Sequence, residues 1–511
     1  MVLSYLIWGC IGLTQSPGFT LDEPWIADPA MSLISTGHLA LPSAGPGNLN
    51  ERESLYQLPF HFVVLSVIFR IFGAGLLQGR LLSLACAAIC LSITYLAGRR
   101  YRPEVGLIAM GLLAVDPMFT SRSRETRNDL FAMIWVIVAW LLADSAALDS
   151  RPKRRVVLLA AAGACLAIAV SSHVIYVGAA AVVGVAWLGW SVLRRDASAQ
   201  IRTLAQAIIF GFVLGIVPVA LYCSRHMDAV RHQLLWHILY HHSSHETLIL
   251  WLKGESMKYF AYYRSTPLLF LVLCVGLAYL LLVSFRSSRQ LTKQSGLVGK
   301  TVMVPLAICC VGLPVWLAVV AHHQPWYHLM VASFWALGAS LGLSELRMAV
   351  HGRRRAVLEG FVAVGLLSAL AITLVGRTYT AIATWGERDV TVYYPAIRRV
   401  IQKGGVKIYG DYRLLFLAKE SGWRFIAEYY YLPIGTSGRF DYVVLSELTE
   451  APAWLDMKPY ELVATIGNGQ TDRHGILRKA RNIFGPVPLP LTNASDLQSP
   501  QFGLDQRLVL I

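Results

Sequence analysis

Charged side chains are scarce in this sequence. Asp, Glu, Lys and Arg make up 15% of its 511 residues, whereas about 25% is usual in soluble globular domains. Hydrophobic residues make up 55%, and the mean hydropathy is +0.52. Apolar runs recur along the chain, each close to the roughly 20 residues that are needed to cross a bilayer. Together with the low charge and the high hydropathy, these runs exclude an ordinary soluble protein. They predict an α-helical polytopic membrane protein.

Patterns typical of several other protein classes are also missing. The eight cysteines all lie in or beside apolar runs, which is neither a disulfide framework nor a zinc-binding spacing. The polar C-terminal region carries no glycine-rich loop of a dinucleotide site. No basic stripe is interleaved with stacking aromatics, so no nucleic-acid partner is expected, although the formal net charge is +15.

The positive charge follows a different pattern. Lys and Arg gather in every second loop between apolar runs, as they do in loops that face the cytoplasm. This alternation predicts about eleven transmembrane helices in a multi-pass protein of the cell (inner or plasma) membrane, with a cytoplasmic N-terminus. It holds only if the short apolar run 60–73 lies in the membrane interface. The expected spans are 2–14, 77–98, 104–120, 130–148, 156–171, 174–193, 204–223, 261–285, 301–321, 327–344 and 356–376.

The membrane part, 1–376, is followed by a region of different character, 377–511. Short runs with strand and helix patterns alternate there, which predicts a small extracytoplasmic α/β domain. Its last residues are rich in Pro at first and are expected to form a loose tail. We expect helices at 394–402 and 413–420, strands at 406–409, 423–427 and 440–445, a pair of strands at 461–466 and 475–478, and the tail at 485–511.

Four segments fall outside the membrane in this topology, and the first, 15–76, opens with the acidic pair Asp22-Glu23. With Pro24 close behind, Asp22 is typical of a helix start, where the carboxylate caps free backbone N–H groups. A carboxylate at a membrane surface can also serve as a general base. The pair shares its face with the other outer segments, 121–129, 224–260 and 322–326, which favours the catalytic interpretation.

The second outer segment, 121–129, carries cations where Lys and Arg are normally depleted. It contains Arg124 and Arg127 and ends at Asp129. Forked guanidinium groups suit phosphate or carboxylate. Pairing of these charges within a solvated loop is an equally good interpretation.

Histidines and aromatic residues mark the remaining outer segments. His237 and His241 have the i,i+4 spacing of metal ligands on one helix face, but an interfacial helix with belt aromatics explains them as well. Near the last outer segment, His323 precedes Tyr327. The Tyr327 hydroxyl can donate to a phosphate or simply anchor a helix end.

Taken together, these groups suit the transfer of a group from a phosphate-linked lipid. A base would remove the proton of an acceptor hydroxyl, and cations would stabilise the departing phosphate. The lipid presents its headgroup at the membrane surface, so no nucleotide site is needed.

At this point the sequence resembles a known family, the lipid-linked-sugar glycosyltransferases of the GT-C fold, near the aminoarabinose and protein O-mannosyl transferases. The resemblance covers roughly residues 1–345. It is carried by Asp22-Glu23, Gln57-Leu58-Pro59, Arg80, Arg127-Asn128-Asp129, Trp236-His237-Ile238 and Pro325-Trp326-Tyr327.

The resemblance implies an inverting transfer from a polyprenyl-phosphate sugar to an acceptor lipid, glycan or protein. It implies that Asp22, with Glu23 beside it, and Asp129 are active-site acids. Tyr327 is similar to a phosphate-contacting tyrosine of the family. His237 is similar to a residue that binds a divalent metal in some members.

The sequence also departs from the family. Aminoarabinose transferases carry Glu-Lys-Pro where this chain has Gln57-Leu58-Pro59, and the usual Lys near Pro325 is replaced by His323-Gln324. Gln57 is kept as a substrate-binding candidate. Phosphate binding then falls to Arg124, Arg127 or histidines such as His323.

Two other functions fit parts of the sequence. A transporter or flippase of lipid-linked sugars usually has charges at mid-membrane depth, broken helices and internal repeats; the sequence shows few mid-span charges and no repeat. In a structural or assembly protein, residues 385–511 would bind a partner and Asp22 would be a cap.

Overall fold

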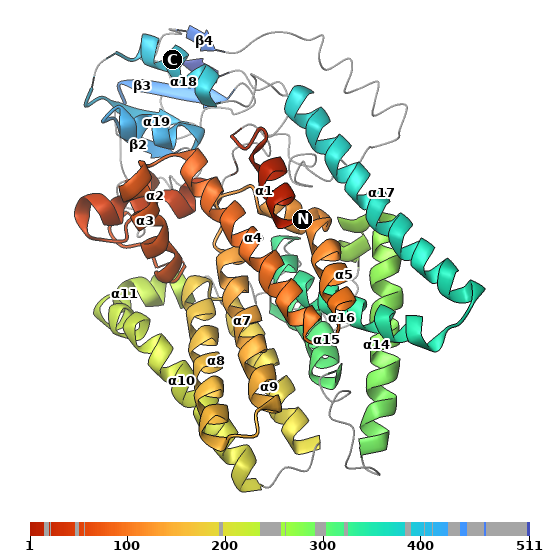
Figure 1. Cartoon of the computed structure of the whole chain (residues 1–511). Coiled ribbons are helices and arrows are strands. Elements are labelled where there is room, and N and C mark those ends of the chain that lie inside the picture. The colour runs from red at the N-terminus through yellow and green to blue at the C-terminus, as the bar shows by residue number, and fades with distance from the viewer. Residues whose placement is uncertain are drawn as a thin grey trace.

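The computed structural model of the chain contains a helical part and a small sheet (Figure 1). The structure describes residues 1–14, 20, 22–45, 51–55, 57–193, 198–235, 257–260, 262–291, 303–320, 325–383, 390–402, 404–410, 412–427, 440–446, 464–466 and 508–510.

Seven helices of the described part are long and apolar enough to cross a membrane. This confirms the predicted polytopic helical class. The seven spans lie in α4 (Leu76–Arg99), α7 (Asp129–Leu148), α8 (Pro152–Ser172), α10 (Ser198–Arg225), α14 (Pro267–Leu291), α16 (Leu329–Ala349) and α17 (Arg353–Ala383).

The other four of the eleven expected spans fall on shorter apolar helices. These are α1 (Val2–Cys10), α5 (Pro103–Ala114), α9 (Tyr176–Leu193) and α15 (Met303–Val320). At 9 and 12 residues, α1 and α5 are too short to cross a bilayer core as single helices, so the expected spans 2–14 and 104–120 are not borne out as full crossings. The expected span 104–120 was wrong in one respect, because it is split between α5 and α6 (Pro117–Arg122). Asp116 caps α6 by accepting a hydrogen bond from the Phe119 backbone N–H at 2.9 Å, and Pro117 cannot continue α5.

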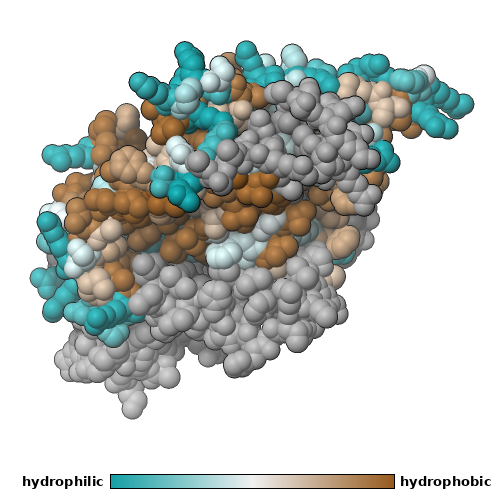
Figure 2. All heavy atoms as spheres, turned by 90° about the horizontal axis from the view of Figure 1, so that it is seen from below, coloured by the Kyte–Doolittle hydropathy of each residue, from teal (hydrophilic) through white to brown (hydrophobic). Residues whose placement is uncertain are grey.

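The surface of the bundle matches a lipid environment. Helices α10 and α17 bury only 22% and 17% of their most apolar windows, so they expose apolar side chains such as Phe210, Leu214 and Leu367. Helix α16, by contrast, is 83% buried and lies within the bundle. Seen from below, brown hydrophobic surface covers much of the described helices, and teal groups gather toward the rim (Figure 2).

Three short helices of the described residues lie between α1 and α4 in the sequence. They are α2 (Asp22–Thr36), the 3-10 helix η1 (Pro42–Ala44) and α3 (Phe60–Phe72), and α2 and α3 lie at one end of the bundle (Figure 1). Helix α3 starts after Pro59 and ends at Gly73, whose φ of 83° favours glycine. At 13 residues it is about 20 Å long, too short to cross a bilayer core of about 30 Å.

The C-terminal region forms the predicted small α/β structure. Strands β1 and β2 are parallel, as are β1 and β3, whereas β5 is antiparallel to β3 and β4, giving the order β2-β1-β3-β5-β4. The elements are α18 (Val390–Val400), β1 (Lys407–Gly410), η5 (Tyr412–Leu414), α19 (Leu415–Glu420), β2 (Arg424–Ala427), β3 (Tyr442–Ser446), β4 (Ala464–Ile466) and β5 (Leu508–Leu510).

The tail 485–511 was expected to be loose, and this expectation was wrong for strand β5. Leu508–Leu510 pairs with both β3 and β4, because antiparallel neighbours satisfy its backbone groups on both sides. The expected strand 475–478 lies outside the described residues.

The sheet packs directly on the short helices of the first segment. One continuous apolar core contains Ile26 and Ala30 of α2, Phe69 of α3, and Leu415 and Phe416 of α19. Figure 1 shows this sheet over α2 and α3 at the same end of the molecule. The segment that carries the acidic pair therefore lies between the helical bundle and the sheet.

Candidate active site

The start of α2 is anchored by Glu23, whose side chain is fully buried. Its carboxylate accepts bonds from Arg80 Nε at 2.8 Å and Arg80 Nη2 at 2.7 Å, and from the backbone N–H groups of Thr20 and Thr126, both at 2.9 Å. Four donors match the approximately four lone-pair sites of a carboxylate. This geometry gives Glu23 a structural role in joining α2, α4 and the 123–128 loop, instead of contact with a substrate.

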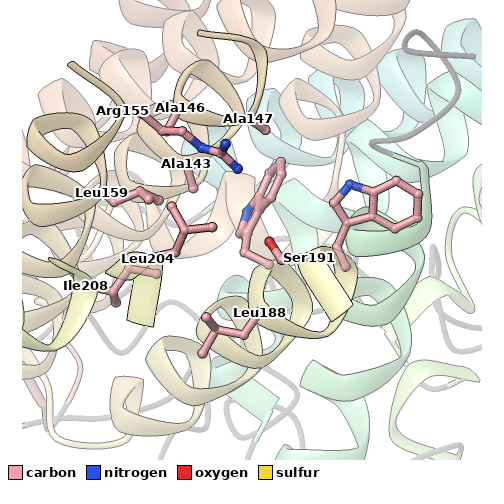
Figure 3. A pocket seen from close by; sticks show the side chains of 11 residues that line it. Ala143, Ala146, Ala147, Arg155, Leu159, Leu188, Ser191, Leu204 and Ile208 are labelled. Carbon is pink, nitrogen blue, oxygen red and sulfur yellow. The ribbon is translucent and has the colours of Figure 1, made fainter. Parts of the chain in front are cut away.

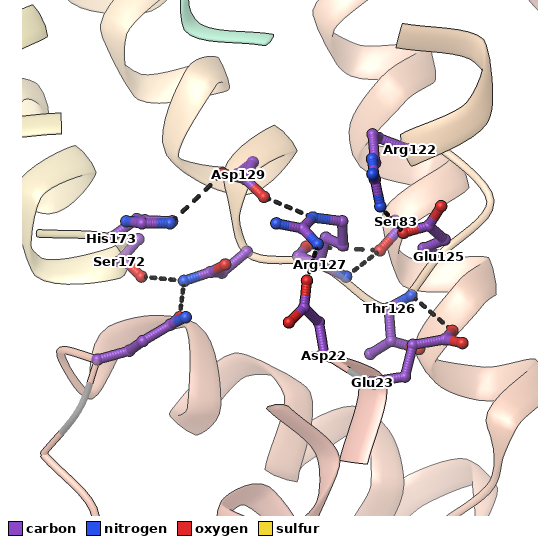
Figure 4. A network of polar contacts seen from close by, with 12 residues as sticks. Asp22, Glu23, Ser83, Arg122, Glu125, Thr126, Arg127, Asp129, Ser172 and His173 are labelled. Atoms are coloured by element: carbon purple, nitrogen blue, oxygen red, sulfur yellow. Dashed lines mark hydrogen bonds and ion pairs between the residues drawn. The ribbon is translucent and has the colours of Figure 1, made fainter. Parts of the chain in front are cut away.

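Asp22, its neighbour, points the other way and stays accessible. Its side chain is 42% exposed, and its Oδ2 accepts a bond from Arg127 Nη1. Arg127 is only 4% exposed and donates from Nε to Asp129 Oδ2 at 2.7 Å. One guanidinium thus bridges two carboxylates, one open to solvent and one buried (Figure 4).

The charge of this arginine is well defined. Burial by itself would lower the pKa of Arg127, but Asp129, Asp22 and Glu125 more than reverse this, and its pKa lies above the usual value. Its backbone N–H donates to Ser83 Oγ at 3.1 Å, which fixes the loop to α4. Arg127 is therefore a permanently charged and rigidly held group.

The 123–128 loop that carries Arg127 is buried along its whole length. Arg122 pairs with Glu125, and Arg124 Nη2 donates to the Ile11 carbonyl oxygen at 2.6 Å. Burial raises the pKa of Glu125 although Arg122 and Arg127 act to lower it. The interpretation of 121–129 as a solvated loop that pairs its own charges holds for the pairs Arg122–Glu125 and Arg127–Asp129, but it was wrong about solvation, because the segment is buried.

A histidine from the next turn extends the row of contacting side chains formed by Asp22, Arg127 and Asp129. His173, directly after α8, lies with its Nε2 3.4 Å from Asp129 Oδ1. Burial lowers the pKa of His173 despite the nearby carboxylates of Asp129 and Asp22, so the ring is neutral at pH 7. The Tyr327 ring stands edge-on to His173 with centroids 5.7 Å apart.

The segment that leads into α3 reaches the same loop. Asn128 Nδ2 donates to Gln57 Oε1 and to the Ser172 carbonyl oxygen, the latter at 2.9 Å. His61 of α3 is buried, and neither of its ring nitrogens has a hydrogen-bond partner. Burial lowers its pKa to about 4, against the raising effect of Asp129 and with the help of His173.

Comparisons with known proteins bear on the fold and on one stretch of the sequence. The family model described as dolichyl-phosphate-mannose-protein mannosyltransferase matches residues 57–222, which include Gln57, Arg127 and Asp129. The crystal structure of ArnT from Cupriavidus metallidurans bound to undecaprenyl phosphate superposes with a TM-score of 0.61 at 13% identity, over 91% of this chain and 95% of that one. This chain has the GT-C fold.

Other comparisons add context. The apo structure of the same ArnT gives a TM-score of 0.60 at 13% identity, over 87% of this chain and 92% of that one. The oligosaccharyltransferase AglB from Archaeoglobus fulgidus, in complex with an inhibitory peptide and a dolichol-phosphate, gives 0.48 at 13% identity, over 87% and 69%. No curated protein sequence matches the chain. The GT-C fold expected from the sequence is confirmed by the ArnT structures.

The structure brings together only part of the predicted GT-C site. Asp22, Arg127 and Asp129 form one chain of contacts, Gln57 reaches it through Asn128, and Tyr327 reaches it through His173. Arg124 instead faces the end of α1. His237 and His323 lie outside the described residues.

Several residues of this region were not singled out from the sequence as site residues. His173 sits in the short turn between two expected spans, and that position on the outer face was the available signal. His61 is the second residue of the short apolar helix that follows Pro59. For the ion pair of Arg80 with Glu23, the signal was a lone arginine near the start of an apolar span.

The described residues around Asp22 do not form a donor set for a tightly held divalent ion, and His237, the predicted metal ligand, lies outside the described part of the chain. Gln57 stands where aminoarabinose transferases carry Glu, and its amide oxygen accepts a bond from Asn128. Among the described residues, no three His, Cys, Asp or Glu side chains are grouped to hold a metal. No chemical step is therefore assigned to a metal.

A separate shallow cleft lies between the ends of α7, α8, α9 and α10 (Figure 3), and its empty space of about 350 Å³ includes open solvent. Arg155 and Ser191 are its polar members, and its other walls are apolar. Arg155 lies near the start of α8, whereas His173 follows its end. At 1.5 Å per residue these positions are roughly 25 Å apart along the helix, so this cleft is not the Asp22 site.

Proposed function

We propose that this protein is an integral-membrane glycosyltransferase. It transfers a sugar from a polyprenyl-phosphate donor to an extracytoplasmic acceptor with inversion, and Asp22 is the general base. The observation that carries the proposal is the Asp22–Arg127–Asp129 row, in which an accessible carboxylate is aimed by a buried, doubly held cation. The GT-C fold and the match to residues 57–222 support the reaction class.

Asp22 suits the base role because one of its two oxygens is fixed while the side chain remains 42% exposed. An acceptor hydroxyl that reaches this carboxylate gives up its proton to Asp22. Its oxygen forms a bond to the anomeric carbon of the sugar as the bond from that carbon to the phosphate oxygen breaks. The bonding electron pair leaves with the polyprenyl phosphate, and a single displacement of this kind inverts the anomeric centre.

Arg127 has a second role in this scheme. Its position between Asp22 and Asp129 fixes both carboxylates, so the base does not need to reorganise during the reaction. Asp129 then acts as an active-site acid that holds Arg127 and faces His173. Glu23 acts as the anchor of α2.

The donor phosphate needs further contacts on the same side. We assign Tyr327 and Arg127 to this task, with Gln57 near the sugar, since all three connect to Asp129 within the network. His323 remains a predicted phosphate contact, whereas Arg124 is buried and donates to the Ile11 carbonyl oxygen, so we do not assign it to the phosphate. The acceptor is a lipid, a glycan or a protein.

We further propose that this end of the bundle lies outside the cell (inner or plasma) membrane, with the N-terminus in the cytoplasm. The alternation of Lys and Arg between loops supports this orientation. The sheet of 377–511, which packs on α2 and α3, would then also be extracytoplasmic.

The test is a transfer assay with purified protein in lipid vesicles, given labelled polyprenyl-phosphate sugars and membrane acceptors. A glycosyltransferase releases polyprenyl phosphate and forms a glycosidic bond of inverted configuration, which NMR of the product reads directly. A flippase instead moves intact labelled lipid across the bilayer without cleaving it. Translocation without bond cleavage, or a product with retained configuration, would contradict the proposal.

A further inference from the structure

An ion pair between a buried carboxylate and a lysine whose side chain is 33% exposed joins α2 to the C-terminal sheet region. Asp28 is fully buried, and Lys419 of α19 places its Nζ 2.9 Å from Asp28 Oδ1. The second carboxylate oxygen accepts the Ser43 backbone N–H at 2.9 Å. Because a buried carboxylate is costly without partners, this contact selects one position of α19 relative to α2.

The pair lies where α2 is weakest. Pro29 is inside the helix and has no backbone N–H, so the turn around Asp28 lacks one internal hydrogen bond. Asp22 is six residues before Asp28, about 9 Å along the helix axis. A tether at Asp28 therefore acts on the part of α2 that leads directly to Asp22.

Helix α2 is consequently held from two sides. Glu23 is held by Arg80 and the Thr126 backbone, both in the membrane part. Asp28 is held by Lys419, in the C-terminal region. The shared apolar core, with the Phe69 and Phe416 rings edge-on at 6.3 Å, supports the second attachment.

We propose that the C-terminal α/β region is a clamp for α2 and that Lys419 is a positioning residue which, through Asp28, holds Asp22 in place. This inference rests on the proposed function for its effect on rate, but the clamp itself is a structural claim. It gives 377–511 a role inside the reaction centre instead of one in binding a partner elsewhere.

The chain supplies a matched control next to Lys419. Glu420 pairs with Arg398 at 2.6 Å, and both side chains are well exposed. Glu420→Gln removes an ion pair from the same helix of the same region without touching α2. A surface pair of this kind contributes little, so any general effect of altering α19 appears in both variants, and a clamp effect appears only in Lys419→Met.

The experiment measures hydrogen–deuterium exchange of peptides from α2 in the full-length protein in lipid nanodiscs. In Lys419→Met we expect α2 amides to exchange about tenfold faster than in wild type, with Glu420→Gln unchanged and Lys419→Arg restored. If Lys419→Met does not fold, the double variant Asp28→Asn/Lys419→Met replaces it, because it leaves no unpaired buried charge. We expect the α2 amides of the double variant to show the same faster exchange. Unchanged α2 exchange in these variants, or equal acceleration in Glu420→Gln, would overturn the clamp.

The transfer assay separates the clamp from the proposed function. If both are correct, Lys419→Met lowers kcat about tenfold and leaves the donor KM within twofold, because the base is displaced while the donor contacts remain. Absence of transfer by wild type overturns the proposed function alone, and the exchange result still decides the clamp. Full kcat in a Lys419→Met protein with loosened α2 overturns the positioning role of Lys419.

Discussion

Replacing Glu23 by Gln tests whether this carboxylate is the anchor of α2. Four donors converge on it, and both Glu23 and its partner Arg80 are 0% exposed. Gln keeps one acceptor oxygen but turns an N–H₂ group toward donors, and it leaves the Arg80 charge without a counter-charge. Breaking a buried pair on one side in this way costs about 3–5 kcal/mol.

The expected change in melting temperature follows from the size of the chain. With an unfolding entropy of about 2 cal/mol/K per residue, 511 residues give roughly 1 kcal/mol/K. Glu23→Gln should then lower Tm by about 3–5 °C when the chain unfolds as one unit. Asp22→Asn breaks only a pair with an exposed partner, worth at most about 1 kcal/mol, and should lower Tm by at most about 1 °C.

The assay is thermal unfolding in one detergent at one scan rate, since membrane proteins often unfold irreversibly and Tm then depends on the rate. The double variant Glu23→Gln/Arg80→Met removes both charges and should recover at least half of the loss. A Tm for Glu23→Gln equal to that of Asp22→Asn would refute the anchoring role. No recovery in the double variant would show that charge pairing is not the cause.

Three further predictions concern other parts of the network. Arg127→Lys keeps the charge but cannot bridge two carboxylates in fork geometry, so kcat should fall at least tenfold; unchanged kcat would contradict the bridging role. The His61 pKa is lowered from 6.5 to about 4 by burial, so the unfolded state binds more protons between these values and stability falls as pH drops from 6.5 to 4, by about 3 kcal/mol. Chemical denaturation of His61→Leu should show a flatter acid slope, and an identical slope would refute this. If His237 binds a divalent ion, chelation should inactivate wild type, and His237→Ala should weaken the metal affinity at least tenfold, because loss of a residue that only supports a ligand already costs about that much; activity that is indifferent to both would remove the metal prediction.

Much of the helical part was predictable from the sequence because hydropathy and loop charge are local signals. The run 60–73 was expected to be one short helix that does not cross the membrane, and α3 spans Phe60–Phe72 with a length too short to do so. The break at Asp116 was not expected, because its apolar neighbours hide it in a hydropathy window. It depends on one cap and one proline.

The site was predictable in its members but less so in its geometry. The pattern Arg127-Asn128-Asp129 and the pair Asp22-Glu23 marked the contacting segments. The opposite environments of Asp22 and Glu23 depend on Arg80 and on the Thr126 backbone, which are distant in sequence. The contact of Asp28 with Lys419 joins two segments that are far apart in the sequence, and no local sequence pattern predicts such a pairing.

The most direct test of the central claim is the transfer rate of Asp22→Asn beside that of Glu359→Gln. Glu359 is a suitable control because its carboxylate is 46% exposed and paired with arginines, but it lies on α17. Loss of a general base predicts that Asp22→Asn lowers kcat about 10²–10⁴-fold, with Tm within about 1 °C of wild type and Glu359→Gln fully active. Full activity of Asp22→Asn in every reaction that the wild type performs would contradict the account.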